Sequence, residues 1–229
     1  MNDHSEKAFF LYLRSRLGDL KTTEKWTLEE ESGRVQQIDG ATPKVVLAKL
    51  LKPAGQLIEI GGKHLSLGRV TVSDAKWWEA AVRLMIFSTA IFLNSGPTES
   101  FAREVEFIVG NKKLLRRAFL LMEPTDETMS AGRYRDQQAA KNRQERWETT
   151  RAFFGSHCGK LPPYDHRGAI ISLFSPDLRE PFVGISRYKL YEMMHEMYVD
   201  LTKRGSYDLA PGELCPCNSG KTFQDCHQR

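Results

Sequence analysis

Cysteine and histidine residues crowd together near the C-terminal end of this sequence. Cys215, Cys217 and Cys226 are followed by His227, and Pro216 stiffens the tight Cys-x-Cys turn. Three thiolates and one imidazole fill a tetrahedral zinc shell. A segment this short has no core of its own, so the metal would supply its folding energy. Because four protein ligands leave no open coordination position, we predict a structural zinc site rather than a catalytic one.

A second candidate for chemistry is Glu104, in a stretch that reads as a buried strand, a Ser/Gly/Pro loop and an amphipathic helix. The apolar face of this helix carries Phe101, Val105 and Ile108. At about 100° per residue, Glu104 falls at the edge of that face, whereas Glu106 points away from it. A carboxylate pressed against an apolar face at the carboxyl edge of a parallel sheet is a candidate catalytic group. The alternative is a surface glutamate that titrates normally.

The elements that would position these residues are short apolar runs that alternate with amphipathic stretches. The predicted strands are about 8–14, 56–60, 90–93, 117–122 and 168–174. The predicted helices are about 42–53, 73–85, 98–110, 134–154 and 186–205. Residues 20–41 are polar and irregular, and they predict a long loop or a weak helix.

Short apolar strands that alternate with helices are typical of a parallel sheet covered on both faces. We therefore predict an α/β fold with a flavodoxin-like, doubly wound, mostly parallel five-stranded sheet, whose functional residues lie at the carboxyl ends of the strands. A polar Pro/Gly linker follows this body at residues 206–212. The predicted domains are an α/β domain over residues 1–205 and a small C-terminal zinc knuckle over residues 206–229.

Length and composition fit one ordinary domain with a small appendage. The chain has 229 residues, and its apolar fraction of 41% can supply a core. The polar N-terminal residues 1–7 lack the features of a signal peptide, and the apolar run 84–93 is too short to span a bilayer. We therefore predict a soluble, cytoplasmic protein without a membrane segment, in which a disulfide framework is disfavoured.

Two further features are given ordinary interpretations. The net charge of +4 is mildly basic, and the basic stretch 133–151 contains Glu145 and Glu148, which favour ion pairing within a helix. We therefore do not expect nucleic acid as a partner. His157 and Cys158 are adjacent, but a nucleophile and its base rarely come from neighbouring positions, so Cys158 is interpreted as a loop thiol.

The cysteine-rich tail resembles the SEC-C motif, which is the zinc-binding tail of the SecA translocation ATPase and of many unrelated bacterial proteins. The resemblance includes all four proposed ligands, Cys215, Cys217, Cys226 and His227, with the spacing of that motif. It implies a knuckle that serves as a docking surface for a protein partner. Nothing else in the chain resembles SecA, so no ATPase activity is implied.

The body, over about residues 8–175, resembles a divergent bacterial TIR-like domain. The residues that carry this resemblance are a strand end at Leu11-Tyr12-Leu13-Arg14-Ser15 with Asp19 beyond it, a glycine pair at Gly61-Gly62, Arg69 before a helix led by Trp77 or Trp78, and the small-residue loop Ser95-Gly96-Pro97-Thr98 before Glu104. Departures from the pattern include Ala102-Arg103 in place of a Trp-Cys pair.

The TIR-like resemblance implies cleavage of NAD at the bond between nicotinamide and ribose, in a bacterial defence or stress system. Glu104 matches the helix glutamate that supports an oxocarbenium-like transition state in TIR enzymes. The same resemblance assigns substrate contacts to Arg14, Ser15, Asp19 and Arg69, in loops at the strand ends, where they would hold phosphate or ribose oxygens.

Two alternatives to this function are kept open. The first is a non-catalytic TIR-like scaffold or signalling module that acts through protein–protein interaction and forms homo-oligomers without a ligand. The second is an enzyme similar to nucleoside deoxyribosyltransferases, which share this type of fold and a glutamate. Analysis of the products formed from NAD and from deoxynucleosides separates the two chemistries.

Overall fold

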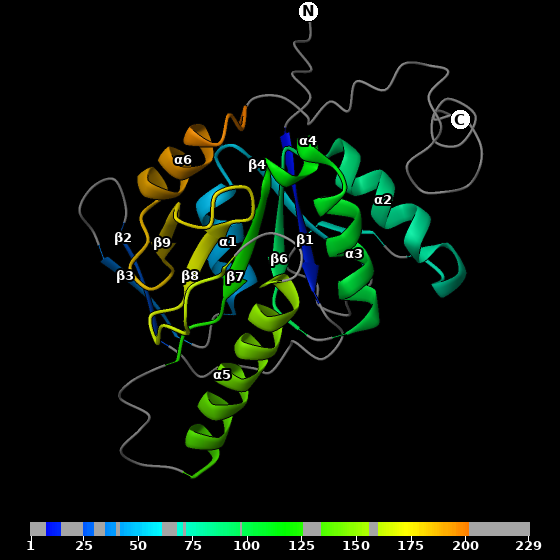
Figure 1. Cartoon of the computed structure of the whole chain (residues 1–229). Helices are drawn as coiled ribbons and strands as arrows, with labels where there is room; N and C mark the ends of the chain where they lie inside the picture. Colours follow the sequence, from blue (N-terminus) through cyan, green and yellow to red (C-terminus); the bar gives the residue numbers. More distant parts are fainter. Residues whose placement is uncertain are drawn as a thin grey trace, which may run out of the picture.

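The computed structural model describes residues 8–14, 25–29, 35–39, 42–60, 68–70, 72–96, 98–125, 134–155 and 160–201. These residues form a body in which helices pack on both faces of a central sheet (Figure 1). Within the described residues, none of the helices combines the length and the apolar content that crossing a bilayer requires.

The sheet is mixed but mostly parallel, in the order β5-β4-β1-β6-β7-β8-β9. Its strands are β1 (Ala8–Arg14), β4 (Gly55–Ile60), β5 (Gly68–Val70), β6 (Ala90–Asn94), β7 (Ala118–Met122), β8 (Ala169–Ser172) and β9 (Arg179–Pro181). The strands from β5 to β7 in this order are parallel to their neighbours, while β8 is antiparallel to β7 and β9 to β8. All residues of β6 and β7 are buried, as expected for parallel strands covered on both faces.

The five predicted strands are all present and the sheet is mostly parallel, but the prediction of five strands is wrong, because β5 and β9 extend the sheet to seven. They keep the order second, first, third, fourth and fifth across the sheet, yet β8 runs in the opposite direction to β7. The reason is the path of the chain after the preceding helix, because that segment returns to the carboxyl end of β7. There the amide N–H of Thr125 donates to the carbonyl of His166 at 2.8 Å, so β8 starts from that edge.

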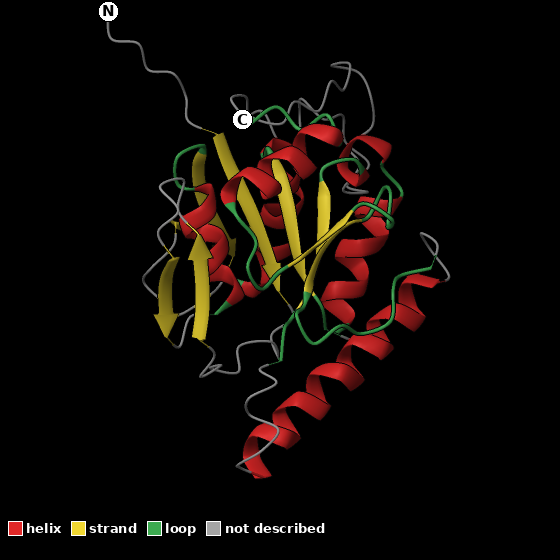
Figure 2. Ribbon diagram, turned by 90° about the vertical axis from the view of Figure 1, so that its left-hand side faces the viewer, coloured by secondary structure: helices red, strands yellow, loops and turns green. Residues whose placement is uncertain are grey.

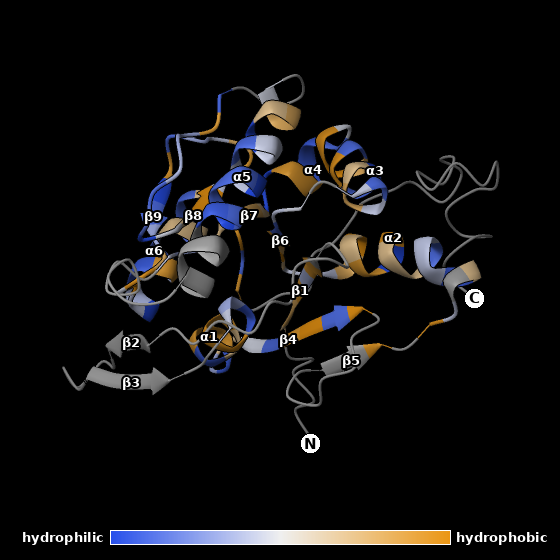
Figure 3. Cartoon of the chain, turned by 90° about the horizontal axis from the view of Figure 1, so that it is seen from below, coloured by the Kyte–Doolittle hydropathy of each residue, from blue (hydrophilic) through white to orange (hydrophobic). Residues whose placement is uncertain are grey.

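Two layers of helices cover the sheet (Figure 3). On one face lie α1 (Pro43–Leu51) and α6 (Arg187–Glu196), and on the other lie α2 (Trp77–Phe87), α3 (Glu99–Val109), α4 (Lys112–Leu115) and the C-terminal half of α5 (Tyr134–Gly155). A 3-10 turn, η1 (Asp74–Lys76), precedes α2.

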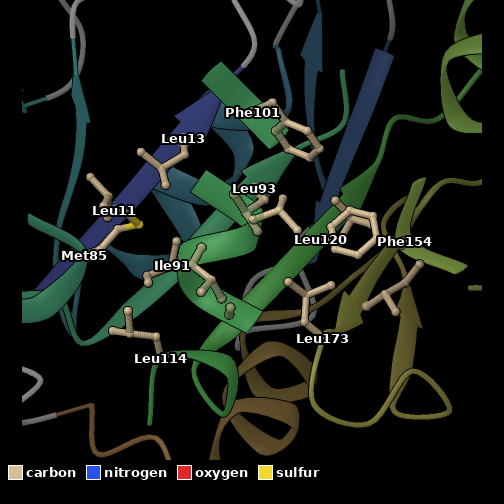
Figure 4. Packing of buried hydrophobic residues seen from close by; sticks show 14 of the residues in the cluster. Leu11, Leu13, Met85, Ile91, Leu93, Phe101, Leu114, Leu120, Phe154 and Leu173 are labelled. Carbon is tan, nitrogen blue, oxygen red and sulfur yellow. The ribbon is translucent and has the colours of Figure 1, made fainter. Parts of the chain in front are cut away.

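The core beneath α3 and α5 is closely packed (Figure 4). Leu93 of β6 and Leu120 of β7 meet Phe101 of α3 and Phe154 of α5, and all four side chains are at most 3% exposed. The rings of Phe101 and Phe154 form an edge-to-face pair with centroids 6.2 Å apart. This packing fixes the face that α3 turns toward the sheet.

The termini of α3 and α6 follow from local hydrogen bonds. The Thr98 hydroxyl accepts a hydrogen bond from the amide of Phe101 at the start of α3, and the Ser186 hydroxyl accepts one from the amide of Lys189 at the start of α6. The last helix is shorter than the predicted 186–205, because Tyr198 takes a positive φ of 58° and the amide of Val199 bonds back to Met194.

The prediction of a loop or weak helix over residues 20–41 is wrong. A two-stranded antiparallel hairpin occupies this region, with β2 (Lys25–Glu29) paired to β3 (Val35–Asp39). The polar composition hid it, because only scattered β-branched and aromatic residues indicate these strands. The prediction that Arg69 lies in a loop is also wrong, because this residue belongs to the short strand β5 and its Cα pairs with Glu59 of β4.

Candidate functional site

The carboxyl ends of the parallel strands bring two of the predicted substrate contacts to one edge of the sheet. Arg14 is the last residue of β1, and its Cα pairs with that of Asn94, the last residue of β6. Arg69 belongs to β5 at the same edge. Only the backbone is described at Arg14 and Arg69, while Ser15 and Asp19 lie outside the described residues.

Glu104 is buried on the core-facing side of α3. The residue is only 1% exposed, and its Oε2 has no hydrogen-bond partner among the residues that the structure describes. Burial raises the pKa of Glu104 from 4.5 to about 8. The alternative of a surface glutamate that titrates normally is therefore wrong, whereas Glu106 is exposed as predicted.

The neighbouring Arg103 does not neutralise Glu104. Arg103 is exposed, and its guanidinium carbon lies 4.1 Å from the centroid of the Trp78 ring on α2. The Trp78 ring in turn meets the ring of Phe107 edge to face, with centroids 5.7 Å apart. This contact holds the arginine on the outer side of α3, so burial acts on the Glu104 carboxyl group without a compensating cation from Arg103.

A second polar group at this edge was missed by the sequence analysis. Asn94 Nδ2 donates to Glu123 Oε1 at 2.8 Å, directly after the end of β7. The other oxygen of Glu123 lies 3.6 Å from Arg143 Nε and 3.5 Å from Arg146 Nη1, both on α5. Tyr164 donates its hydroxyl to the backbone carbonyl of Glu123 at 2.8 Å. The sequence does contain a signal for this pair, because Asn94 and Glu123 are the polar residues that end two apolar runs.

A buried ion pair lies on the opposite face of the sheet. Lys44 Nζ of α1 is 3.5 Å from Glu59 Oε2 of β4, and both side chains are at most 5% exposed. The sequence pattern did not indicate this pair, because its partners come from different elements. It attaches the first turn of α1 to β4 near the edge that carries Arg14 and Asn94.

Two surface cavities lie at opposite ends of the described strands β7 and β8. One, of about 460 Å³, lies at the carboxyl edge between the segment 162–168 and β9, and is bordered by Tyr164, His166 and Arg179. The Arg167 side chain holds the pKa of Asp165, on the same rim, below its usual range through a hydrogen bond. The other, of about 470 Å³, lies at the far edge beside Phe174 and Tyr198.

Comparison with known proteins supports the interpretation of the tail. Residues 213–229 match the SEC-C motif, which confirms the predicted motif and favours metal binding in this segment. A search of curated proteins and a search of solved structures return no match. Cys215, Cys217, Cys226 and His227 lie outside the described residues, so their geometry as a zinc site stays a prediction. The TIR-like resemblance of the body also stays a prediction.

Proposed function

We propose that this chain is a TIR-like effector that cleaves NAD at the nicotinamide–ribose bond, with a zinc knuckle that docks a protein partner. The observation that carries the proposal is the buried carboxyl group of Glu104, which lies on the helix that follows β6 and has one oxygen without a partner among the described residues. A carboxyl group that is buried and forms no ion pair within the described part of the chain is a group whose charge responds strongly to a positively charged substrate.

In the proposed reaction, the bond between the ribose C1′ and the nicotinamide nitrogen breaks. The electron pair of that bond leaves with nicotinamide, which becomes neutral, and positive charge develops on the ribose ring. The Glu104 carboxylate stabilises this charge, and water then adds to C1′ and loses a proton. The products are nicotinamide, ADP-ribose and one proton. The positive charge of the nicotinamide ring favours the ionised form of Glu104 when the substrate binds.

NAD turnover by the wild type and by Glu104→Gln tests this proposal. The variant keeps the size of the side chain and removes its charge, so we expect kcat to fall by about a hundredfold or more. In the wild type, kcat/KM should rise with pH and level off above about 8, where Glu104 is ionised in the free protein. Nicotinamide release, followed by chromatography from pH 6 to pH 9, measures both effects.

The matched control is Glu106→Gln, which changes the same residue type on the exposed side of α3. This variant should keep the wild-type rate and pH profile. Equal turnover by the wild type and Glu104→Gln contradicts the catalytic role. Absence of turnover in all three proteins, at concentrations that allow self-association, contradicts the proposed cleavage. A parallel assay with deoxynucleosides detects deoxyribosyl transfer.

For the knuckle, we propose that Cys215, Cys217, Cys226 and His227 hold one structural zinc ion. The match to the SEC-C motif and the thiolate-rich donor set support this proposal. Purified protein should contain about one zinc per chain, and Cys215→Ser should reduce this content strongly, because a tetrahedral site loses much of its affinity with one thiolate. Elemental analysis measures the ratio, and Cys158→Ser is the matched control that should retain zinc.

The scaffold alternative is favoured by one specific observation, which is the nearly complete burial of Glu104. A catalytic carboxylate must reach its substrate, so a catalytic protein needs a local opening beside α3. A scaffold needs no such opening, and it predicts oligomers that form without ligand and are indifferent to Glu104→Gln. Light scattering with and without NAD distinguishes this behaviour from assembly that depends on the substrate.

A further inference from the structure

The Asn94 side chain has one end of its amide engaged in a hydrogen bond, and the other end has no partner among the residues that the structure describes. Nδ2 donates to Glu123 Oε1 at 2.8 Å. Only the nitrogen can donate to a carboxylate, so this contact fixes which end of the amide is which. Oδ1 has no hydrogen-bond partner in the described part of the chain, and the residue is 1% exposed.

The neighbours of Asn94 prevent its amide from turning to satisfy this oxygen. Glu123 is 8% exposed, and its second oxygen lies within 3.6 Å of both Arg143 and Arg146. Rotation of the Asn94 amide would bring its carbonyl oxygen against the carboxylate. A buried acceptor without a donor is costly, and native structures keep few of them. The arrangement therefore favours a donor supplied by a ligand.

The position of Asn94 in the sheet is suited to ligand binding. Its Cα pairs with Arg14 of β1 on one side, and with Leu121 of β7 on the other. It thus ends the middle one of three adjacent parallel strands, at the edge where open α/β sheets bind their ligands. The chain then passes through a short loop into α3, which carries Glu104.

We infer that Asn94 is a substrate-binding residue, whose Oδ1 accepts a hydrogen bond from a ribose hydroxyl on the nicotinamide side of NAD, and that Glu123 is its positioning residue. This inference rests on the proposed function. An amide oxygen attracts an uncharged O–H or N–H donor and disfavours phosphate, so the pyrophosphate must lie elsewhere along the edge. Because Asn94 is covered in this form of the protein, the substrate enters through a local opening.

The test is equilibrium binding to the full-length, zinc-loaded chain that carries Glu104→Gln, which prevents turnover. Calorimetry measures the affinity for NAD and for the analogues that lack the 2′-hydroxyl or the 3′-hydroxyl of the nicotinamide ribose. Each ligand is titrated into the protein that retains Asn94 and into Asn94→Leu. We expect Asn94→Leu to bind NAD about tenfold more weakly. One deoxy analogue should bind about tenfold more weakly than NAD to the protein that retains Asn94. The same analogue should bind to Asn94→Leu as tightly as NAD does, which is the coupling that a double-mutant cycle detects.

A structural asparagine provides the matched control. Asn111 caps α4 by accepting hydrogen bonds from the amides of Lys113 and Leu114. Asn111→Ala should lower the thermal midpoint and leave the NAD affinity unchanged. Asn94→Leu should lower the NAD affinity more than it lowers the thermal midpoint.

Unchanged NAD affinity in Asn94→Leu overturns the inference, and so does an absence of NAD binding when Asn94 is present. The same comparison is made with the NAD analogue in which nicotinic acid replaces nicotinamide. If Asn94→Leu and this replacement share one loss of affinity, and neither deoxy analogue does, the assignment to a ribose hydroxyl is overturned. Binding and turnover fail separately, because NAD that binds to the wild type through Asn94 without being cleaved contradicts the proposed function alone.

Discussion

Glu104→Gln is expected to remove most of the loss of stability that this protein undergoes on going from pH 5 to pH 9. The unfolded chain ionises Glu104 near pH 4.5, whereas the folded protein keeps it protonated up to about pH 8. Between these values the folded state binds more protons at Glu104, so the contribution of Glu104 to stability is fully present below pH 4.5 and is lost as pH rises through 8. The wild type should therefore lose about 4 kcal/mol over this interval from Glu104 alone.

Urea denaturation at pH 5, 7 and 9 measures this effect as a difference between the wild type and Glu104→Gln. Contributions from other titrating groups cancel in that difference. Glu106→Gln, on the exposed side of α3, should follow the wild-type curve at each pH. Parallel curves for the wild type and Glu104→Gln would show that Glu104 is ionised at neutral pH, and would contradict the burial on which the proposed site depends.

Glu123→Ala is expected to destabilise the fold by about 3 kcal/mol at pH 7. This change leaves the 7%-exposed Arg143 without the carboxylate 3.6 Å from its Nε. It also removes the acceptor of the Asn94 amide. A buried cation whose partner is removed has lost the compensation for its desolvation, and this cost is larger than the net value of the pair.

The control for Glu123→Ala is Glu148→Ala, which breaks a shorter ion pair on the surface of α5, the helix that carries Arg143. Glu148 Oε2 lies 2.8 Å from Arg151 Nη1, and both side chains are more than 40% exposed. Its loss should cost at most about 0.5 kcal/mol and should vanish in high salt. Similar, salt-sensitive losses in both variants, measured by urea denaturation, would contradict a buried role for Glu123.

The elements around Glu104 could be predicted because local chemistry determines them. The apolar runs that became β6 and β7 are long enough to read as buried strands, and Thr98 marks the start of α3. The burial of Glu104 could also be predicted from the sequence, because Phe101, Glu104, Val105 and Ile108 follow the i, i+3, i+4, i+7 spacing of one helix face.

The direction of β8 and the Glu123 cluster could not be predicted from local patterns. A strand has the same alternation in either direction, so its direction is decided by where the preceding segment returns to the sheet. The partners of Glu123 are 20 or more residues away in the chain, at Arg143, Arg146 and Asn94. The strands β5 and β9, of three residues each, are too short to produce a periodic signal.

The reversal of β8 also explains the course of α5. A helix between two parallel strands must carry the chain from one edge of the sheet to the other, whereas the segment between β7 and β8 leaves and returns at the same edge. The 22-residue helix α5 is therefore free to extend beyond the body, as Figure 1 and Figure 2 show for its N-terminal half. Trp147 and Phe154 of the C-terminal half pack into the core. A change in the length of the outer part of α5 would therefore leave the order and pairing of the strands unaltered.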